Sequence, residues 1–454
     1  MYTVRNQCEC SATASQVLRR PCLTLEWCAC LAPSRQQSPH CTPLGVWNLH
    51  LLPLETGATC LDGSRAGFYY VPSPSEHPML RDSWVFFFEG GGWCVGDEDC
   101  SARAKTSRGS SRTWQNQTAV GGILNRCCYF TRFCQFHRVY LKSCDGRGFA
   151  GNERYVTAQN APATTISAGQ AIVKATIEAL VASYGLAKKP VSMLISGCSA
   201  GGRAALLYAP AIRRMMLSRG VTFTRFKVMG IASIFFPHTV LGPFASRRAH
   251  GSLGSRELGL NQTFLTDDRV LSPFAEHMRT IAEASDMQMG DLATTSMADC
   301  RSRMPPAESW RCSWGMEPVE LMPYDIPVFL VQSVFDLWQT SCVLAASASS
   351  VFEGGCSSGP GWSRCIPWGQ SIRATQPLAT CSRHQQDRMN GFQLSNLAVL
   401  AQSQALHRPG YGGFFHACND HCTTSDANVR LEINNVSMRD ATQRWCALVV
   451  APNN

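Results

Sequence analysis

The 454-residue sequence has few charged residues and no long apolar run. Charged residues make up 16% of the chain, below the roughly 25% of an ordinary soluble domain, while hydrophobic residues make up 45%. A chain of this length and apolar content forms a sizeable core, so disorder as the main state is excluded. No stretch approaches the roughly 18 uncharged apolar residues of a membrane span, so we expect no stable membrane insertion.

Positive charge is modest and spread along the chain. The net charge is +9, from 41 Lys and Arg against 32 Asp and Glu, and no long basic run occurs. Nucleic acid is therefore not an expected partner. A mild positive field favours a polyanionic substrate or surface, although plain solubility is the simpler explanation.

The first residues, MYTVRNQCECS, contain neither the positively charged region nor the apolar region of a secretory signal. The 23 cysteines nevertheless indicate an oxidising compartment, where such residues serve as disulfides. We therefore expect a secreted, extracellular or cell-wall protein whose start lies upstream or whose export route is unusual. A cytosolic protein with reduced cysteines is the alternative.

Three sequons agree with secretion, since Asn116, Asn261 and Asn435 each begin an Asn-x-Ser/Thr tripeptide. Each predicts a glycan on a surface loop. Such tripeptides also arise by chance, so each one alone is weak support.

Residues 1–45 contain six cysteines but no sustained helical or strand period. We interpret them as a cysteine-rich N-terminal segment that is disordered, leader-like or closed by disulfides. Zinc binding is a competing interpretation, but the cysteine spacing fits no standard finger, so no metal site is predicted. Residues 46–454 are predicted to form a single domain.

Short apolar runs alternate with helical patterns from Trp47 onward. The apolar runs that indicate buried strands lie at residues 84–88, 139–141, 190–196 and 327–331. Periodicity predicts a helix over 167–184 and another over 203–217, which Pro210 is expected to kink or interrupt. This alternation predicts an α/β fold with a mostly parallel sheet covered by helices on both faces, and chemistry at the carboxyl ends of the strands.

The sharpest motif is GCSAG at residues 197–201, a G-x-S-x-G sequence between a strand pattern and a helical pattern. This context is typical of a nucleophile elbow, a strained turn that needs small neighbours and exposes the serine hydroxyl. The turn also directs the following backbone N–H at a developing oxyanion. Ser199 is therefore predicted to be a nucleophile, with a purely structural turn as the alternative.

A serine nucleophile needs a base, and the base needs an orienting acid. In hydrolases of this kind the chain order is Ser, then Asp or Glu, then His. Asp336 follows the apolar run VFLVQSVF, where such an acid belongs, although a helix N-cap would use the same residue. The histidines beyond it are His384, His407, His416 and His421. The last two share the loop FFHACNDHC, and the pattern barely separates them.

A second glycine-rich turn, EGGGWC at residues 89–94, follows an early strand, where hydrolases place another oxyanion donor. Gly92 or Trp93 would supply the N–H groups, because glycines let the backbone approach a substrate carbonyl. A phosphate-binding loop is the competing use. The Gly-Lys-Ser/Thr ending of such loops is absent, so no nucleotide is expected.

Six motifs occur in an order and spacing that resemble the pectin acetylesterase/Notum family: FEGGGWC, the basic stretch at 103–111, SCDGRGFAG, SGCSAGG, FDLWQ and HACNDHC. The segment CLDGSRAGFYY at 60–70 is similar to the family's N-terminal signature. The resemblance covers roughly residues 50–450 and implies an extracellular serine carboxylesterase with an α/β-hydrolase-type fold. One segment departs from the family pattern, because residues 230–236 lack an acid that members commonly carry, which puts that part of the pocket wall in doubt.

The resemblance implies a catalytic triad of Ser199, Asp336 and His421, with no catalytic role for His416. It also implies an oxyanion hole formed by the backbone N–H groups of Gly92, Trp93 and Ala200. Acyl transfer of this kind needs neither a metal nor an organic cofactor.

The resemblance leaves two substrates open. Deacetylation of pectin or a related cell-wall polysaccharide is the main prediction, and Notum-like removal of a lipid acyl group from a secreted protein is the alternative. Pocket depth decides between an acylated polysaccharide and an acylated protein as the partner. From another functional class, a catalytically inactive, secreted carbohydrate-binding protein on the same fold is the alternative. In each case we expect a monomer.

Cysteines also lie beside the predicted chemistry. Cys94 follows the oxyanion turn, Cys198 precedes the nucleophile, and Cys418 and Cys422 flank the histidine. We expect cross-links there to hold the loops in catalytic geometry. The odd total leaves at least one thiol unpaired within a monomer.

Overall fold

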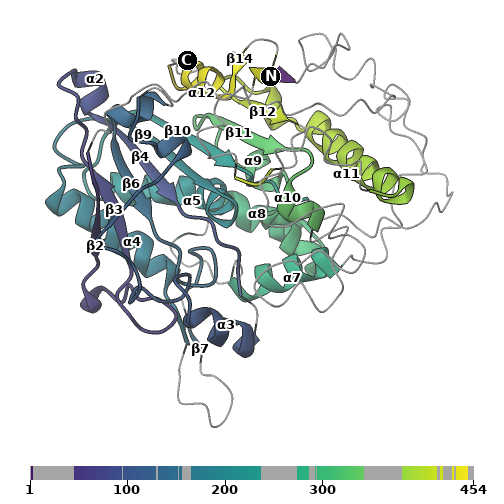
Figure 1. Ribbon diagram of the computed structural model, residues 1–454, viewed down its shortest axis with the longest axis horizontal. Coiled ribbons are helices and arrows are strands. Elements are labelled where there is room, and N and C mark those ends of the chain that lie inside the picture. The colour runs from purple at the N-terminus through teal and green to yellow at the C-terminus, as the bar shows by residue number, and fades with distance from the viewer. Residues whose placement is uncertain are drawn as a thin grey trace.

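The structure is a computed structural model of the chain, shown as a ribbon in Figure 1. It describes residues 2–3, 45–94, 96–128, 131–151, 153–155, 165–236, 273–285, 292, 294–341, 381–416, 420–422, 432–433 and 436–447. Of the predicted N-terminal segment, only Tyr2, Thr3 and Gly45 lie within these ranges, so its interpretation falls outside the described residues. The sequon residue Asn116 is exposed, whereas Asn261 and Asn435 also fall outside.

The strands are β1 (Tyr2–Thr3), β2 (Trp47–Leu51), β3 (Gly67–Val71), β4 (Ser83–Phe88), β5 (Gln117–Thr118), β6 (His137–Leu141), β7 (Glu153–Tyr155), β8 (Thr165–Ser167), β9 (Val191–Cys198), β10 (Phe223–Ile231), β11 (Val328–Ser333), β12 (Gly412–His416), β13 (Glu432–Ile433) and β14 (Val436–Ser437). The α-helices are α2 (Pro78–Arg81), α3 (Gly96–Ala104), α4 (Gly169–Ser183), α5 (Ala200–Leu217), α7 (Pro273–Ser285), α8 (Thr295–Arg303), α9 (Glu317–Glu320), α10 (Leu337–Gln339), α11 (Arg383–Gln402) and α12 (Met438–Ala447).

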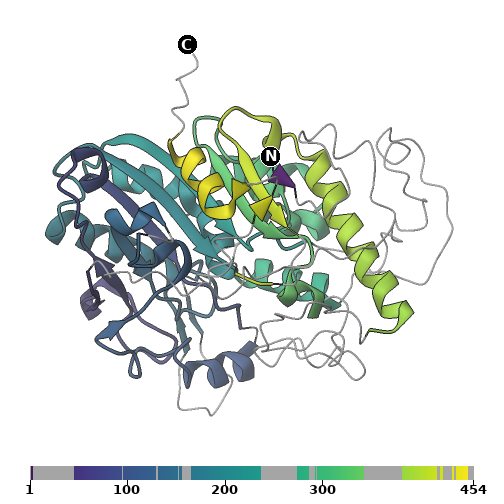
Figure 2. The ribbon, with the colours of Figure 1, turned by 45° about the horizontal axis from the view of Figure 1, so that its top comes forward.

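A ten-stranded sheet runs through the centre of the described part of the chain, in the order β1-β12-β11-β10-β9-β4-β6-β3-β2-β5 (Figures 1 and 2). Along this spatial order, each strand from β1 as far as β6 pairs in parallel with its neighbour. The last three strands, β3, β2 and β5, each pair antiparallel with the strand before them. The four predicted strands correspond to β4, β6, β9 and β11. The predicted mostly parallel α/β sheet is thereby confirmed.

Both faces of the sheet are buried, which explains why its central strands are continuously apolar. In β4, Trp84, Phe86 and Phe88 join the core formed with α4, α5 and α11. Val85 and Phe87 join the core on the opposite face, to which α12 contributes. Helices therefore cover the two faces, as the alternating pattern predicted.

The helical patterns correspond to α4 and α5. Pro210 lies inside α5 and does not interrupt it. A proline inside a helix costs about 3 kcal/mol because it removes one hydrogen bond. Burial of residues such as Leu206 and Ile212 against the sheet offsets that cost. No helix among the described residues is long and apolar enough to span a membrane.

Candidate active site

Ser199 lies in the sharp turn between β9 and α5. Its φ of 58° and ψ of −130° are unusual for a residue with a side chain and are typical of a strained functional turn. The turn is tight because the chain packs against the end of β4: a Cβ at Gly201 would lie 2.5 Å from the carbonyl oxygen of Glu89. The structure thus has the strand–turn–helix geometry that the G-x-S-x-G motif predicted.

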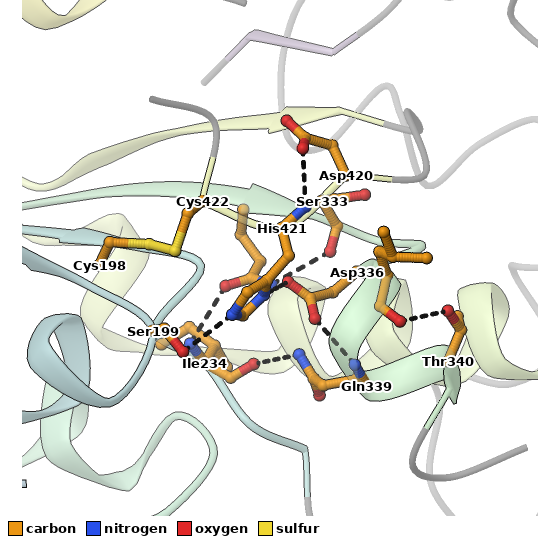
Figure 3. Close-up of polar contacts among 12 residues, drawn as sticks. Cys198, Ser199, Ile234, Ser333, Asp336, Gln339, Thr340, Asp420, His421 and Cys422 are labelled. Carbon is orange, nitrogen blue, oxygen red and sulfur yellow. Dashed lines mark hydrogen bonds and ion pairs between the residues drawn. A yellow bond between two sulfur atoms is a disulfide. The ribbon is translucent and has the colours of Figure 1, made fainter. Parts of the chain in front are cut away.

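His421 bridges Ser199 and Asp336 (Figure 3). Its Nε2 lies 2.8 Å from Ser199 Oγ, and its Nδ1 lies 2.8 Å from Asp336 Oδ2. The Asp336 side chain has no exposed surface, and that of His421 is 15% exposed. With the carboxylate as an acceptor, the proton belongs on Nδ1, which leaves Nε2 to accept the hydrogen of the Ser199 hydroxyl.

Asp336 has the geometry of both alternatives that the sequence left open, because its two carboxylate oxygens have different partners. Oδ1 accepts the backbone N–H of Gln339 at 2.9 Å and so caps the short helix α10, while Oδ2 faces His421. The Gln339 side chain in turn accepts the N–H of Phe236 and donates to the carbonyl of Ile234. The divergent segment at 230–236 thus supports the loop that carries the acid.

The loop that carries His421 is fixed on several sides. The His421 N–H donates to Asp420 Oδ1 at 2.8 Å, and the Leu337 N–H donates to the Asp420 carbonyl at 3.2 Å. The ring of Trp338 lies 6.2 Å from the imidazole, centroid to centroid, in a stacked orientation. A disulfide joins Cys422 to Cys198 (Figure 3). These contacts hold the imidazole between the hydroxyl and the carboxylate.

His416, the other histidine of this loop, lies in the core at the end of β12. It is 1% exposed, and burial lowers its pKa to about 4 despite the opposing effect of Asp336. It is therefore neutral at neutral pH. The structure brings His421 and not His416 to Ser199, while His407 is exposed and the side chain of His384 lies outside the described residues.

The glycine loop, residues 89–94, lies beside Ser199. Gly92 has a φ of 70°, a conformation that favours glycine. The backbone N–H groups of Gly92, Trp93 and Ala200 donate no hydrogen bond to any described residue. The Trp93 side chain packs at 5.2–5.3 Å, centroid to centroid, on Phe235 and Trp314. The Trp93 side chain therefore anchors the loop, while the N–H groups of Gly92, Trp93 and Ala200 remain available as donors.

Ser199, His421 and the glycine loop line one cavity of about 530 Å³. Part of its wall is apolar, formed by Phe87, Val120, Ile123 and Leu124. The ionisable side chains of the wall, beyond His421 and the tyrosines, are Glu89, Arg108, Lys142 and His277. Lys142 forms an ion pair with Glu89 at 2.7 Å, and burial lowers the pKa of His277 to about 4. The cavity therefore presents apolar surface, the Lys142–Glu89 ion pair and the positive charge of Arg108.

Sequence reasoning did not assign roles to Trp338, Lys142, Arg108 or His277. Trp338 and Arg108 lie within the motifs named above, and Lys142 directly precedes one of them. The motifs therefore mark the positions of these residues, but they do not indicate a chemical role for any of them. His277 had no signal, because a single histidine on a helix is ordinarily structural.

Disulfides join residues next to the chemistry, as expected for Cys94 and Cys198. The pairs in the described ranges are Cys60–Cys144, Cys94–Cys100, Cys128–Cys134, Cys198–Cys422 and Cys300–Cys312. Cys446 has a free thiol, and Cys418 lies outside the described residues.

The arrangement suits acyl transfer. A hydroxyl with an imidazole nitrogen at hydrogen-bond distance can lose its proton as it attacks a carbonyl, and a buried carboxylate stabilises the imidazolium that forms. Backbone N–H groups near the hydroxyl can stabilise the oxyanion of the tetrahedral intermediate.

Known proteins are similar to this chain in sequence and in fold. The family model for Pectinacetylesterase matches residues 44–239 and 270–450. Pectin acetylesterase 4 of Arabidopsis thaliana is 25% identical over 396 residues, covering 86% of this chain and 80% of the relative. The palmitoleoyl-protein carboxylesterase NOTUM of Homo sapiens is 25% identical over 291 residues, covering 63% of this chain and 50% of the relative.

The fold is similar to that of a solved structure. A crystal structure of the Wnt deacylase Notum from Drosophila has a TM-score of 0.60 at 20% identity, covering 89% of this chain and 93% of that chain. The sheet order described above and the similarity to this solved structure both indicate an α/β-hydrolase-like fold. The predicted family is confirmed, and the chain belongs to the pectinacetylesterase family of carboxylic ester hydrolases.

Proposed function

We propose that the protein is a serine carboxylesterase that removes acetyl groups from pectin or a related cell-wall polysaccharide. The observation that carries the proposal is the contact of His421 with both Ser199 Oγ and Asp336 Oδ2, each at 2.8 Å. A binding protein on the same fold does not need a serine, a histidine and an aspartate in these mutual contacts. An inactive carbohydrate-binding protein is therefore the weaker explanation.

In the proposed mechanism, His421 Nε2 accepts the hydroxyl proton while Ser199 Oγ attacks the ester carbonyl. The N–H groups of Gly92, Trp93 and Ala200 stabilise the resulting oxyanion. The tetrahedral intermediate then releases the sugar alcohol, which takes the proton from His421, and leaves an acyl-enzyme. Water, deprotonated by His421, attacks the acyl carbon and releases the acid and the free serine.

Charge in the cavity supports an acidic polysaccharide as the substrate. Arg108 and Lys142 line the same cavity as Ser199. Pectin is rich in uronate carboxylates, so a sugar bound with its acetyl ester at Ser199 places carboxylates near these two cations. A fatty acyl chain in the same space would instead desolvate charged groups, which is unfavourable.

Deacylation of a lipid-modified protein is the second candidate. The apolar wall formed by Phe87, Val120, Ile123 and Leu124 favours it, because these side chains offer an acyl chain a continuous surface. Palmitoleoyl-protein carboxylesterases are among the relatives of the chain. In both candidates the ester lies at Ser199, but the first places uronate carboxylates near Arg108 and Lys142, and the second places a long acyl chain on the apolar wall.

We further propose that the protein is secreted or associated with the cell wall, monomeric, and folded as one domain from residue 46. Five disulfides within the described residues support an oxidising location. The sheet joins β2, which begins at Trp47, to β12, which ends at His416, and this supports a single domain.

The proposal is tested with purified wild-type protein and the variant Ser199→Ala. Wild type is expected to release acetate from acetylated polygalacturonate and to hydrolyse 4-nitrophenyl acetate, and Ser199→Ala is expected to do neither. Ser196→Ala, which removes a buried hydroxyl from the same strand, is the matched control and should keep full activity. If the wild-type protein hydrolyses 4-nitrophenyl acetate but releases no acetate from the polysaccharide, the esterase activity stands and acetylated pectin is excluded as the substrate.

A further inference from the structure

Arg103 is a buried cation directly behind the glycine loop. It lies on α3 and is 8% exposed. Its Nη2 donates to the carbonyl oxygen of Gly91 at 2.5 Å, and the same nitrogen lies 3.5 Å from the carbonyl oxygen of Gly92. The Gly91 carbonyl belongs to the same peptide unit as the Gly92 N–H, and the Gly92 carbonyl belongs to the same unit as the Trp93 N–H.

A trans peptide unit is planar, so its C=O and its N–H point in opposite directions. A cation that holds the carbonyls of Gly91 and Gly92 therefore directs the N–H groups of Gly92 and Trp93 to the other side of the loop. That side is the cavity, because Gly91, Gly92 and Trp93 line it with Ser199, whereas Arg103 is not among its described lining residues. Hydrogen bonding at the carbonyl also polarises the peptide and strengthens its N–H as a donor.

The loop needs such a constraint. Gly91 and Gly92 have φ values of 152° and 70°, and glycines populate many conformations at similar free energy. Arg108, from the same basic stretch, donates to the carbonyl oxygen of Gly90, one residue earlier. Two guanidinium groups therefore hold three consecutive carbonyls of this loop.

A purely structural role for Arg103 is a poor explanation of its burial. The disulfide Cys94–Cys100 already ties α3 to the end of the glycine loop. Burial of a charge is unfavourable, and it lowers the pKa of Arg103, an effect that Arg108 increases and that Asp145 opposes. An unbranched apolar side chain such as methionine would fill much of the space without that cost.

We propose that Arg103 is the positioning residue of the oxyanion hole, which aims and polarises the N–H groups of Gly92 and Trp93 through their carbonyls. This inference rests on the proposed function. Arg103 acts through N–H groups that bind the oxyanion, and the oxyanion forms only as the reaction proceeds. Its removal should therefore lower kcat more than it changes KM.

The experiment compares Arg103→Lys and Arg103→Met with wild type on 4-nitrophenyl acetate. Since removal of one oxyanion donor lowers kcat roughly 10²–10³-fold, we expect Arg103→Met to lower kcat about 10–100-fold and to change KM less than about threefold. Arg103→Lys keeps the charge on a side chain that is one atom shorter than the path to Arg103 Nη2, and we expect an intermediate loss.

A second readout separates positioning from general damage. A small trifluoromethyl ketone forms a tetrahedral adduct with the serine, and its oxygen occupies the place of the oxyanion. In both variants its inhibition constant should rise by the factor by which kcat falls. Arg112→Met, which removes an exposed arginine paired with Asp62, is the control and should change neither value.

A wild-type kcat in Arg103→Lys and Arg103→Met would overturn the inference. So would a lower kcat with an unchanged inhibition constant, or an equal loss in Arg112→Met. If Arg103→Met does not fold, Arg103→Lys decides alone by the same two values. Ser199→Ala is measured in parallel: if it stays active, the proposed function fails and this inference with it, whereas an inactive Ser199→Ala with unaltered Arg103 variants refutes this inference alone.

Discussion

Cys198 and Cys422 are joined by a disulfide, and each directly adjoins one of the two residues that meet at the centre of the site. Cys198 precedes Ser199 at the end of β9, and Cys422 follows His421 in a loop 224 residues away in sequence. The covalent bond therefore limits the separation of the hydroxyl and the imidazole, which stand 2.8 Å apart.

Removal of this disulfide should impair catalysis as well as stability. We expect the double variant Cys198→Ala/Cys422→Ala to lose roughly 2–5 kcal/mol of unfolding free energy, as is usual for a native disulfide, and to have a lower kcat because His421 is less confined. The double variant Cys300→Ala/Cys312→Ala removes a disulfide between α8 and the segment that follows it, and should lose stability only. Equal kcat in the two double variants, measured on folded protein, would contradict a positioning role.

The two histidines of one loop should differ sharply in function. His421→Gln removes the group that contacts both Ser199 and Asp336, and we expect kcat to fall by roughly 10⁴-fold or more. His416→Gln changes a buried neighbour and should keep kcat within about tenfold of wild type once activity is normalised to folded protein. Steady-state kinetics on 4-nitrophenyl acetate measures both, and a larger loss in His416→Gln would reverse the assignment.

Buried histidines should make the fold sensitive to acid. Burial lowers the pKa of His416 to about 4 from an ordinary 6.5, so between these values the unfolded chain binds a proton that the folded chain does not. The contribution of His416 is fully present above pH 6.5 and is lost as the pH falls toward 4, by up to roughly 3 kcal/mol. His137 and His277 act in the same direction.

Urea unfolding at about pH 7.5 and pH 4.5 tests this pH dependence. Wild type should lose free energy of unfolding between the two values, and His416→Gln should lose less. His407→Gln replaces an exposed histidine and should behave as wild type. An equal loss in wild type and His416→Gln would show that His416 does not contribute.

Salt should distinguish the two candidate substrates. If Arg108 and Lys142 attract uronate carboxylates, kcat/KM for acetylated polygalacturonate should fall severalfold between about 20 and 300 mM NaCl, because ions screen this attraction. The neutral substrate 4-nitrophenyl acetate serves as the control and should show little change. Equal salt dependence for the two substrates would argue against recognition of the uronate.

Local sequence predicts Ser199 and Asp336 as candidates for the nucleophile and the acid, because an elbow motif and a late strand each lie within a few consecutive residues, and the structure places both residues in contact with His421. The choice between His416 and His421 was beyond pattern reasoning and required the family resemblance. In the structure it depends on distant contacts: the Val334 N–H pairs with the His416 carbonyl in the sheet, whereas His421 Nε2 lies 2.8 Å from Ser199 Oγ. Such pairings are properties of the sheet register and are not visible in a loop sequence.

Arg103 illustrates a second kind of limit. Its stretch was recognisable as a motif, but a guanidinium that binds two carbonyls leaves no periodic or compositional signal. Pro210 shows the reverse case, in which a strong local rule was overridden because α5 is buried along most of its length. Long-range packing decided both outcomes.

The most direct test of Ser199 as the nucleophile is covalent labelling with a fluorophosphonate, followed by mass spectrometry of the digested protein. The probe forms a phosphonyl ester with an activated serine and releases fluoride. We expect a single stoichiometric adduct on the peptide that contains Ser199, with labelling lost in Ser199→Ala and after heat denaturation, and strongly slowed in His421→Gln. An adduct on a different residue, or no adduct on folded wild-type protein, would contradict it.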